Sequence, residues 1–293
     1  MVSTAVMNYL MEIAVISFIF PGVLLVIWKL RTRKSIRPAF TGAFTFLMFA
    51  KLLQVIPYSF FIGFTNPISK VIRTNEILYA LYLGIVAALF EETGRYLAFR
   101  YFLPKYGENR ETAVTYGIGH GGVECMLMYG FTNLQYYAAA TVINTIPDAT
   151  TALPKAMIDE VTGLTLSDCI MDGIGTLLFL VLQIGLSIFI FQAYRNDYLR
   201  NRLIGFAMGF HVLAYLPDGF YKAKLIPHFV SIILLSVTVG LVFYVAWVIY
   251  KEMGENEKKQ EEARRKLSAS AAGSGWDMAK QKLSNIDEKQ EEH

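Results

Sequence analysis

Long hydrophobic stretches separated by short polar segments fill the first 250 residues of the chain. Each stretch is long enough to cross the hydrocarbon core of a bilayer as a helix, which takes about 20 residues. They predict spans near residues 5–28, 39–63, 76–103, 111–138, 170–193, 203–221 and 225–250. The stretches lack the alternation of an outer-membrane barrel, and a helix satisfies its own backbone polar groups in lipid. The pattern therefore predicts an all-α, polytopic transmembrane helical bundle with about seven spans.

Two segments lie outside these spans. Residues 139–169 contain Pro147 and Pro154 and predict a long external loop that can hold a short interfacial helix. Residues 251–293 are rich in Lys, Glu and Gln, and they predict a charged tail of one or two polar helices interrupted at Ala272-Gly273-Ser274-Gly275. The domain prediction is a membrane bundle over residues 1–250 followed by this tail.

Composition agrees with a membrane protein. Hydrophobic residues make up 54% of the 293 residues, and the mean hydropathy of +0.40 is too high for an ordinary soluble domain. The two cysteines, Cys125 and Cys169, have no pairing pattern, so neither a disulfide framework nor a thiolate metal site is expected. The net charge of +3 adds little, and no nucleic-acid partner is predicted.

Basic residues between the spans predict the orientation. They gather in alternate loops, at Lys29, Arg31, Arg33, Lys34 and Arg37, at Arg100, Lys105 and Arg110, and at Arg195, Arg200 and Arg202. The intervening loops carry few. The positive-inside rule then places the N-terminus outside and the tail in the cytoplasm. The first span lacks a basic leading region and a clear cleavage site, so it is expected to be an anchor.

Charged residues inside the predicted spans are the main functional signal. The third span carries Glu91-Glu92-Thr93-Gly94-Arg95, the fourth carries His120 and Glu124, and the sixth carries His211. Inserting a charge at mid-membrane costs roughly 2.5–3.5 kcal/mol even on lenient scales. Intramembrane ionisable groups therefore indicate a functional site.

These groups are predicted to share one depth. At a rise of 1.5 Å per residue, Glu91, Glu92, His120 and His211 lie roughly 12–18 Å from the cytoplasmic face. Lys51 and Glu12 fall near this layer and are expected to neutralise each other or the cluster. Unrelated polar positions would scatter in depth, so the convergence predicts a shared site.

Helical spacing suggests how the site is organised. Arg95 lies four residues after Glu91 and three after Glu92, so it can pair with either. One acid can then be anchored structurally while the other serves as a base. With His120, Glu124 and His211 nearby, the set suggests peptide hydrolysis by glutamate-activated water, with a histidine polarising the carbonyl. His and Glu are also ordinary zinc ligands, but HExxH is absent and no metal or other cofactor is firmly implied.

These motifs resemble the YhfC family of bacterial membrane peptidases, which is similar to the CAAX-protease and bacteriocin-processing group. The group's diglutamate-arginine motif corresponds to Glu91, Glu92 and Arg95, its aromatic-to-histidine motif to Tyr116 and His120, and its late histidine to His211. The resemblance implies a CAAX-protease-like core, an intramembrane protease of the bacterial plasma membrane, and a membrane-associated peptide or protein substrate.

Two positions depart from the wider group. Arg95 comes one residue early, which leaves open whether Glu91 or Glu92 activates water. Tyr215 stands four residues after His211 in place of asparagine, and Glu124 or Asp218 could substitute for it.

Other hypotheses remain open on the sequence. The Glu91/Glu92/Arg95 cluster could be a buried ion pair that fixes helix register. A proton- or ion-coupled transporter also uses such residues, although inverted repeats are absent. A non-catalytic adaptor or immunity protein could recruit partners through the charged tail. The substrate and the oligomeric state are not predicted.

Overall fold

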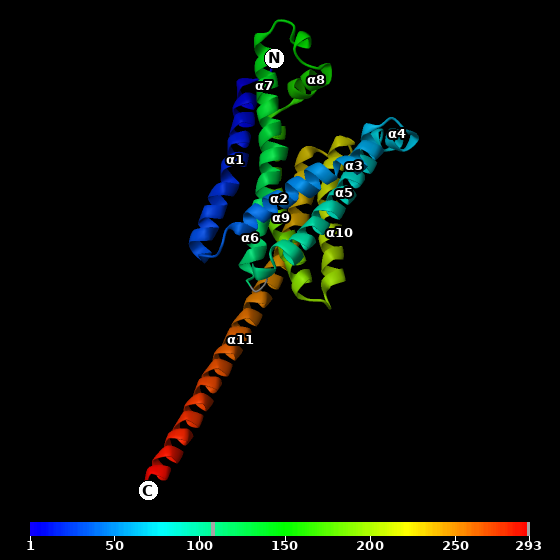
Figure 1. The fold of residues 1–293 in the computed structure, drawn as a ribbon. Coiled ribbons are helices and arrows are strands. Elements are labelled where there is room, and N and C mark those ends of the chain that lie inside the picture. The colour runs from blue at the N-terminus through cyan, green and yellow to red at the C-terminus, as the bar shows by residue number, and fades with distance from the viewer. Residues whose placement is uncertain (107–108, 292–293) are drawn as a thin grey trace. The chain divides into compact units, whose positions relative to one another are not determined.

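The protein is described by a computed structural model that covers the backbone of residues 1–106 and 109–291, with side chains up to residue 266 and at Ser268 (Figure 1). Among these residues there are helices and connections but no strand, which confirms the predicted all-α bundle. The chain divides into two compact units, residues 1–249 and residues 250–293.

Within the part of the chain that the structure describes, six helices are long and apolar enough to cross a membrane. They are α1 (Thr4–Thr32), the run Arg37–Gly63, the run Glu76–Phe102, α9 (Leu166–Arg195), α10 (Arg200–Lys222) and the His228–Lys266 part of α11 (His228–Glu291). Their bounds follow the predicted spans closely, except that the last continues beyond residue 250.

The remaining predicted span, 111–138, is a helical run that is not among these six. It consists of α6 (Glu111–Glu124), η5 (Cys125–Gly130) and α7 (Phe131–Thr145), and α6 packs against α1, α2 and α9 (Figure 1). Its glycines and polar side chains lower its hydropathy, because this helix carries part of the polar cluster. Seven is therefore an approximate count of spans.

Several of the long helices contain π-helical segments. The second run consists of α2 (Arg37–Thr45), η1 (Phe46–Leu53), α3 (Val55–Tyr58) and η2 (Ser59–Gly63), and α5 (Glu76–Leu97) continues into η3 (Ala98–Phe102). The segments η1, η2, η3 and η5 are π-helical, a conformation that is often found at functional sites. Two of them, η1 and η5, meet at the site described below.

The connection between α7 and α9 is shorter than predicted. Helix α7 continues to Thr145, and α9 begins at Leu166 behind a capping box formed by Thr165 and Asp168. The expected short helix is present as α8 (Lys155–Gly163), preceded by the turn η6 (Ala149–Thr151). The other short elements are α4 (Pro67–Arg73) and η4 (Pro104–Tyr106).

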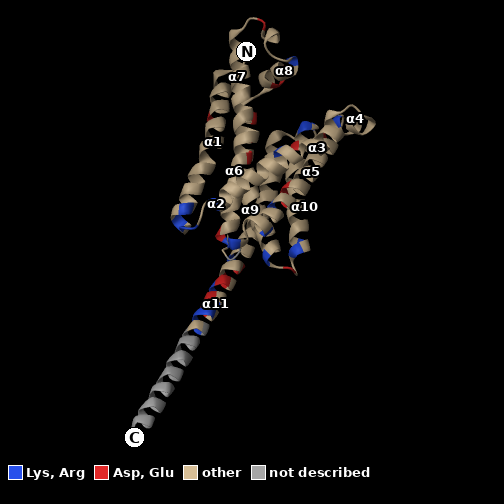
Figure 2. Cartoon of the chain, in the orientation of Figure 1, with Lys and Arg blue, Asp and Glu red and all other residues tan. Residues whose placement is uncertain are grey.

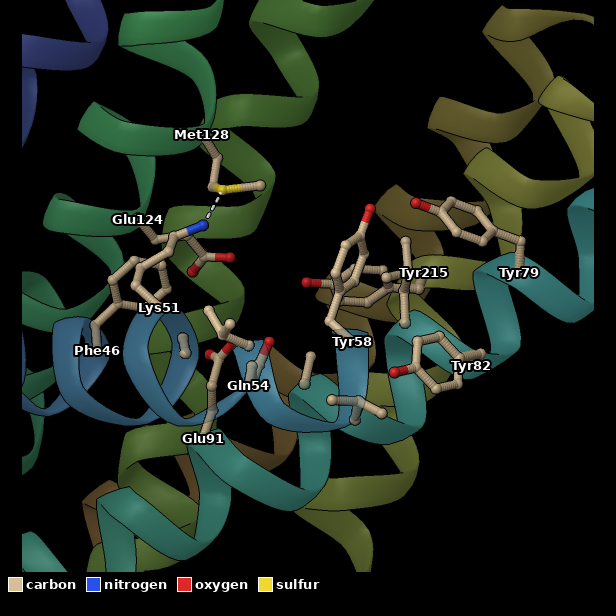
Figure 3. A pocket seen from close by; sticks show the side chains of 15 residues that line it. Phe46, Lys51, Gln54, Tyr58, Tyr79, Tyr82, Glu91, Glu124, Met128 and Tyr215 are labelled. Carbon is tan, nitrogen blue, oxygen red and sulfur yellow. Dashed lines mark hydrogen bonds between the residues drawn. The ribbon is translucent and has the colours of Figure 1, made fainter. Parts of the chain in front are cut away.

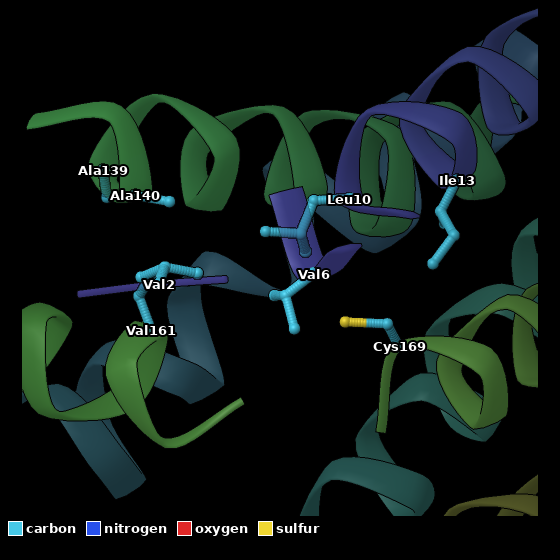
Figure 4. Close-up of a cluster of buried hydrophobic side chains, with 8 residues drawn as sticks. All are labelled: Val2, Val6, Leu10, Ile13, Ala139, Ala140, Val161 and Cys169. Atoms are coloured by element: carbon cyan, nitrogen blue, oxygen red, sulfur yellow. The ribbon is translucent and has the colours of Figure 1, made fainter. Parts of the chain in front are cut away.

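A hydrophobic cluster fixes the beginning of the chain to this region (Figure 4). Its buried members are Val2, Val6, Leu10, Ile13, Ala139, Ala140, Val161 and Cys169, from the start of the chain and from α1, α7, α8 and α9. The Asn144 side chain accepts a hydrogen bond from the Val2 backbone N–H and donates one to its carbonyl, both at 2.8 Å. Cys169 and Cys125 are both free thiols, in agreement with the sequence prediction.

The tail is a single helix, which is one of the two arrangements predicted for it. Helix α11 runs without a break from His228 to Glu291, so the predicted interruption at Ala272-Gly273-Ser274-Gly275 is wrong. A glycine within a helix costs only about 1 kcal/mol relative to alanine. The surrounding Ala, Lys, Glu and Gln residues are strong helix formers, and their propensity outweighs the two glycines.

Close packing of α2 on α6 holds the second helical run against the polar cluster. A Cβ atom at Gly119 would overlap the Ala39 backbone, and one at Gly42 would overlap the Tyr116 carbonyl. The two helices therefore approach at a distance that only glycine allows at these positions. This contact places η1, which follows α2 directly, over His120 of α6, and the Phe46 and His120 ring centroids lie 5.3 Å apart.

Candidate functional site

The structure brings all six predicted site residues into one buried cluster. Glu91, Glu92 and Arg95 come from α5, His120 and Glu124 from α6, and His211 from α10. None of these residues is more than 4% exposed. The side chains predicted to meet from spans three, four and six are therefore found together.

Arg95 forms its ion pair with Glu92. Its Nη1 atom donates to both carboxylate oxygens of Glu92, each at 2.7 Å, and its Nη2 atom donates to Oε1 of Gln183. Nδ1 of His211 lies 2.8 Å from Glu92 Oε1. Since an ionised carboxylate can only accept, His211 donates here from Nδ1. Glu92 is thus held from two sides within the protein.

Glu91 has a different environment from its neighbour. Its Oε2 atom lies 3.0 Å from His120 Nε2, accepts from Gln183 Nε2 at 3.3 Å, and lies 3.9 Å from His211 Nε2. Of the two adjacent acids, Glu91 lines a cavity and Glu92 does not. The sequence allowed either acid to pair with Arg95, and the structure leaves Glu91 free to face a ligand.

Several buried polar atoms of the cluster have no partner within the protein. They are Nε of Arg95, Nδ1 of His120, Nε2 of His211 and Oε2 of Glu124. Glu91, His120 and Glu124 each offer one donor atom, and these atoms lie within 4.8 Å of one another. A buried polar group without a partner is costly, so His120 Nδ1, His211 Nε2 and Glu124 Oε2 are available to a ligand.

A cavity of about 320 Å³ opens beside Glu91 and Glu124, and Figure 3 shows the side chains that line it. We call it the site cavity; Lys51, Tyr58, Tyr82 and Tyr215 supply other polar groups of its wall. Its apolar wall comes from Phe46, Ala50, Val55, Leu83, Val86 and Ala87. An apolar cavity with a few convergent polar groups at its inner end is typical of a substrate site.

Lys51 projects into the site cavity from η1, and in Figure 3 its amine lies beside the Glu124 carboxylate. The amine lies 2.6 Å from the Met128 sulfur, which η5 supplies. Glu12, which was expected to share in neutralising Lys51, lies on an exposed face of α1 instead. Lys51 is thus a charge of the site cavity. Of the two partners expected for it, Glu12 or the cluster, the structure shows the cluster.

The structure also places the candidate polar partners of His211, and Tyr215. Asp218 was considered as a partner for His211, but its side chain is 57% exposed and pairs with Lys222 at 2.8 Å. Glu124, the alternative, does join the cluster. Tyr215 lines the site cavity, and its ring centroid lies 5.9 Å from that of His211.

Sequence reasoning missed Gln183. Its side chain is fully buried on α9, where it accepts from Arg95 and donates to Glu91, and so links the two halves of the cluster. The sequence did indicate it, because Gln183 is an amide in the middle of an otherwise apolar span. Such a group is costly in lipid unless it is hydrogen-bonded within the bundle.

Comparisons with known proteins agree on one relationship. The sequence model of a family described as YhfC intramembrane metalloprotease matches residues 15–239, which include the whole cluster. The "Uncharacterized membrane protein YhfC" of Bacillus subtilis (strain 168) is 27% identical over 261 residues, covering 85% of this chain and 97% of that protein. No solved structure is significantly similar.

Proposed function

The chain belongs to the YhfC family of intramembrane metalloproteases, and we propose that it hydrolyses a peptide bond of a membrane-associated protein or peptide. The proposal rests on the different surroundings of the two adjacent acids. Glu92 is held by Arg95 and His211, while Glu91 faces a cavity beside two imidazoles.

Glu91 is the group that accepts the proton of the attacking water and returns it to the leaving amine nitrogen as the C–N bond breaks. His120 and Gln183 hold its Oε2 atom and so fix the direction of the carboxylate. A base positioned in this way typically contributes a factor of about 10²–10⁴ to the rate. Glu92 and Arg95 do not face the cavity, and their role is to hold Glu91 and His211 in place.

His211 is placed to assist at the carbonyl. Glu92 binds its Nδ1 atom, and its Nε2 atom, which has no protein hydrogen-bond partner, lies 3.9 Å from Glu91 Oε2. An imidazole between two carboxylates can carry a proton on both nitrogens. From this position Nε2 can donate to the oxygen of the scissile carbonyl as negative charge develops there.

The residues present fit the metal that the family description implies. Glu91, His120 and Glu124 would hold it, since their donor atoms lie close together and Glu124 Oε2 has no partner in the protein. Glu91 would bind it through one carboxylate oxygen and keep the other as the base. Imidazole and carboxylate are ordinary zinc ligands. When bound, a zinc ion would lower the pKa of a water molecule and polarise a carbonyl oxygen.

Replacement of Glu124 by glutamine is expected to lower zinc content from about one ion per protein to well below half. The reason is the loss of one of three close anionic or imidazole donors. Elemental analysis of the purified protein, before and after a chelator, measures this directly. Asp197→Asn, which removes a carboxylate that is 85% exposed, serves as the control. Equal zinc content in the Glu124 variant and the control would contradict the assignment of these ligands.

We also propose that the N-terminus faces the outside of the bacterial plasma membrane and that the tail is cytoplasmic. Figure 2 shows Lys and Arg gathered where α1 ends and where α9 passes into α10, which are loops predicted to be cytoplasmic. Protease added to right-side-out vesicles should leave a C-terminal tag intact, whereas inside-out vesicles should lose it. The reverse pattern would refute this orientation.

An ion-coupled transporter is the alternative for the same residues. The described helices include π-helical segments in three of the runs, but the sequence has no inverted repeat of the kind on which many transporters are built. Cleavage products in proteoliposomes without ion flux would support the protease. Ion flux without cleavage would support the transporter.

A further inference from the structure

A second cavity, of about 630 Å³, adjoins the site cavity. It lies among α1, α5, α6, η5, α7, α8, α9, α10 and the first turns of α11. Its wall includes Leu83, Glu124, Met128 and Tyr215, which also line the site cavity. Five further acids line it, namely Asp159, Glu160, Asp168, Asp172 and Asp218. We call it the acidic cavity.

The charge of this wall is strongly unbalanced. Six carboxylates line the acidic cavity, and the basic groups among its lining residues are Lys222 and His228. Lys222 pairs with Asp218 at 2.8 Å. His228 lies 3.2 Å from Asp168 and 3.5 Å from Asp172. Even with both bases charged, negative charge remains in excess.

Other local contacts stabilise some of these acids without supplying positive charge. Glu160 accepts a hydrogen bond from the Tyr136 hydroxyl at 2.5 Å, and Asp168 accepts one from the Tyr221 hydroxyl at 3.2 Å. Asp172 and Asp218 keep 47% and 57% of their side chains exposed. They can therefore meet a cation that enters the cavity.

Glu124 connects the acidic cavity to the catalytic cluster. It lines both cavities, it is only 4% exposed, and its Oε2 atom has no partner within the protein. A chain lying in the acidic cavity would pass Glu124 and then reach Glu91. The acidic cavity is therefore continuous with the site cavity and carries an excess of negative charge.

We propose that the acidic cavity binds a basic segment of the substrate, so that the protein selects peptides with Lys or Arg near the scissile bond. This proposal rests on the proposed protease function. Along α10, Asp218 lies seven residues beyond His211, and along α9, Asp172 lies eleven residues before Gln183. At 1.5 Å per residue these offsets are about 10 Å and 16 Å, toward the same end of the two antiparallel helices. An extended peptide covers them in about three to five residues.

Peptide binding to the full-length protein tests this subsite. The Glu91→Gln protein in neutral phosphatidylcholine nanodiscs would be titrated with fluorescent apolar peptides that carry either Lys or Gln at one position. Lys three to five residues from the centre of the peptide is expected to tighten binding by about 10-fold. Asp172→Asn combined with Asp218→Asn should bring this ratio close to one, and each single variant should lower it several-fold. Asp197→Asn, which removes an exposed carboxylate outside the cavity, should leave the ratio unchanged.

The outcomes separate this inference from the function on which it rests. Equal binding of the Lys and Gln peptides to the parent protein would overturn it. A preference for Lys that survives the loss of both aspartates would overturn it as well. If the wild-type protein cleaves none of the peptides while the aspartate-dependent preference is present, the protease proposal fails and the basic-segment subsite stands.

Discussion

Replacing Glu91 with glutamine is expected to lower the rate of peptide cleavage by roughly 10²–10⁴-fold, the usual contribution of a positioned general base. Glutamine has nearly the same shape as glutamate, and its amide can still contact His120 and Gln183. It cannot accept the proton of a water molecule. The buried ion pair between Glu92 and Arg95 is untouched, so the variant should insert and fold as the wild type does.

The measurement compares cells that express the wild type with cells that express the variant. Mass spectrometry of the membrane fraction would count the new peptide termini that depend on an active enzyme. Glu76→Gln is the matched control, because it makes the same chemical change at an exposed position in the first turn of the same helix. Cleavage at the wild-type rate by Glu91→Gln would exclude Glu91 as the base.

The depth argument explains why most of the candidate site could be predicted from the sequence. A charged side chain within a span is costly in lipid, so the helices turn such side chains toward one another. The rise per residue of a helix then gives the depth of each charge from its position in the sequence. Glu91, His120 and His211 meet for this reason. Depth alone cannot say which atoms pair, because the two acids lie three and four residues from Arg95, about one helical turn away.

The details that the sequence could not supply depend on packing between helices. Arg95 pairs with Glu92 because Gln183 of α9 receives the other end of the guanidinium, and no spacing rule links residues 88 positions apart. Asp218 lies on the same face of α10 as His211, but it reaches the end of the helix and pairs with Lys222. The uninterrupted tail depends on local propensity instead of packing between helices. Two glycines cost too little to end a helix made of strong helix formers.

Removal of the Arg95 charge, by Arg95→Met, is expected to destabilise the bundle by about 3–5 kcal/mol, the usual effect of breaking a buried ion pair. Methionine fills part of the space, but Glu92 then loses its bidentate partner and Gln183 loses a donor. Both partners of the ion pair are fully buried, so water cannot compensate. Lys222→Met, which breaks a half-exposed pair on α10, should cost no more than about 1 kcal/mol.

Thermal unfolding of the detergent-solubilised protein measures both variants, and a second substitution separates loss of charge balance from loss of packing. When Glu92→Gln is added to Arg95→Met, the unpaired buried charge is removed, while the glutamine oxygen can still accept from His211 Nδ1. Much of the lost stability should then return, because an uncompensated charge is more costly than an absent pair. If the single Arg95 variant is as stable as the wild type, the Glu92–Arg95 pair does not support the site. If the double variant is no more stable than the single variant, the space filled by the arginine, rather than its charge, holds α5 against α9.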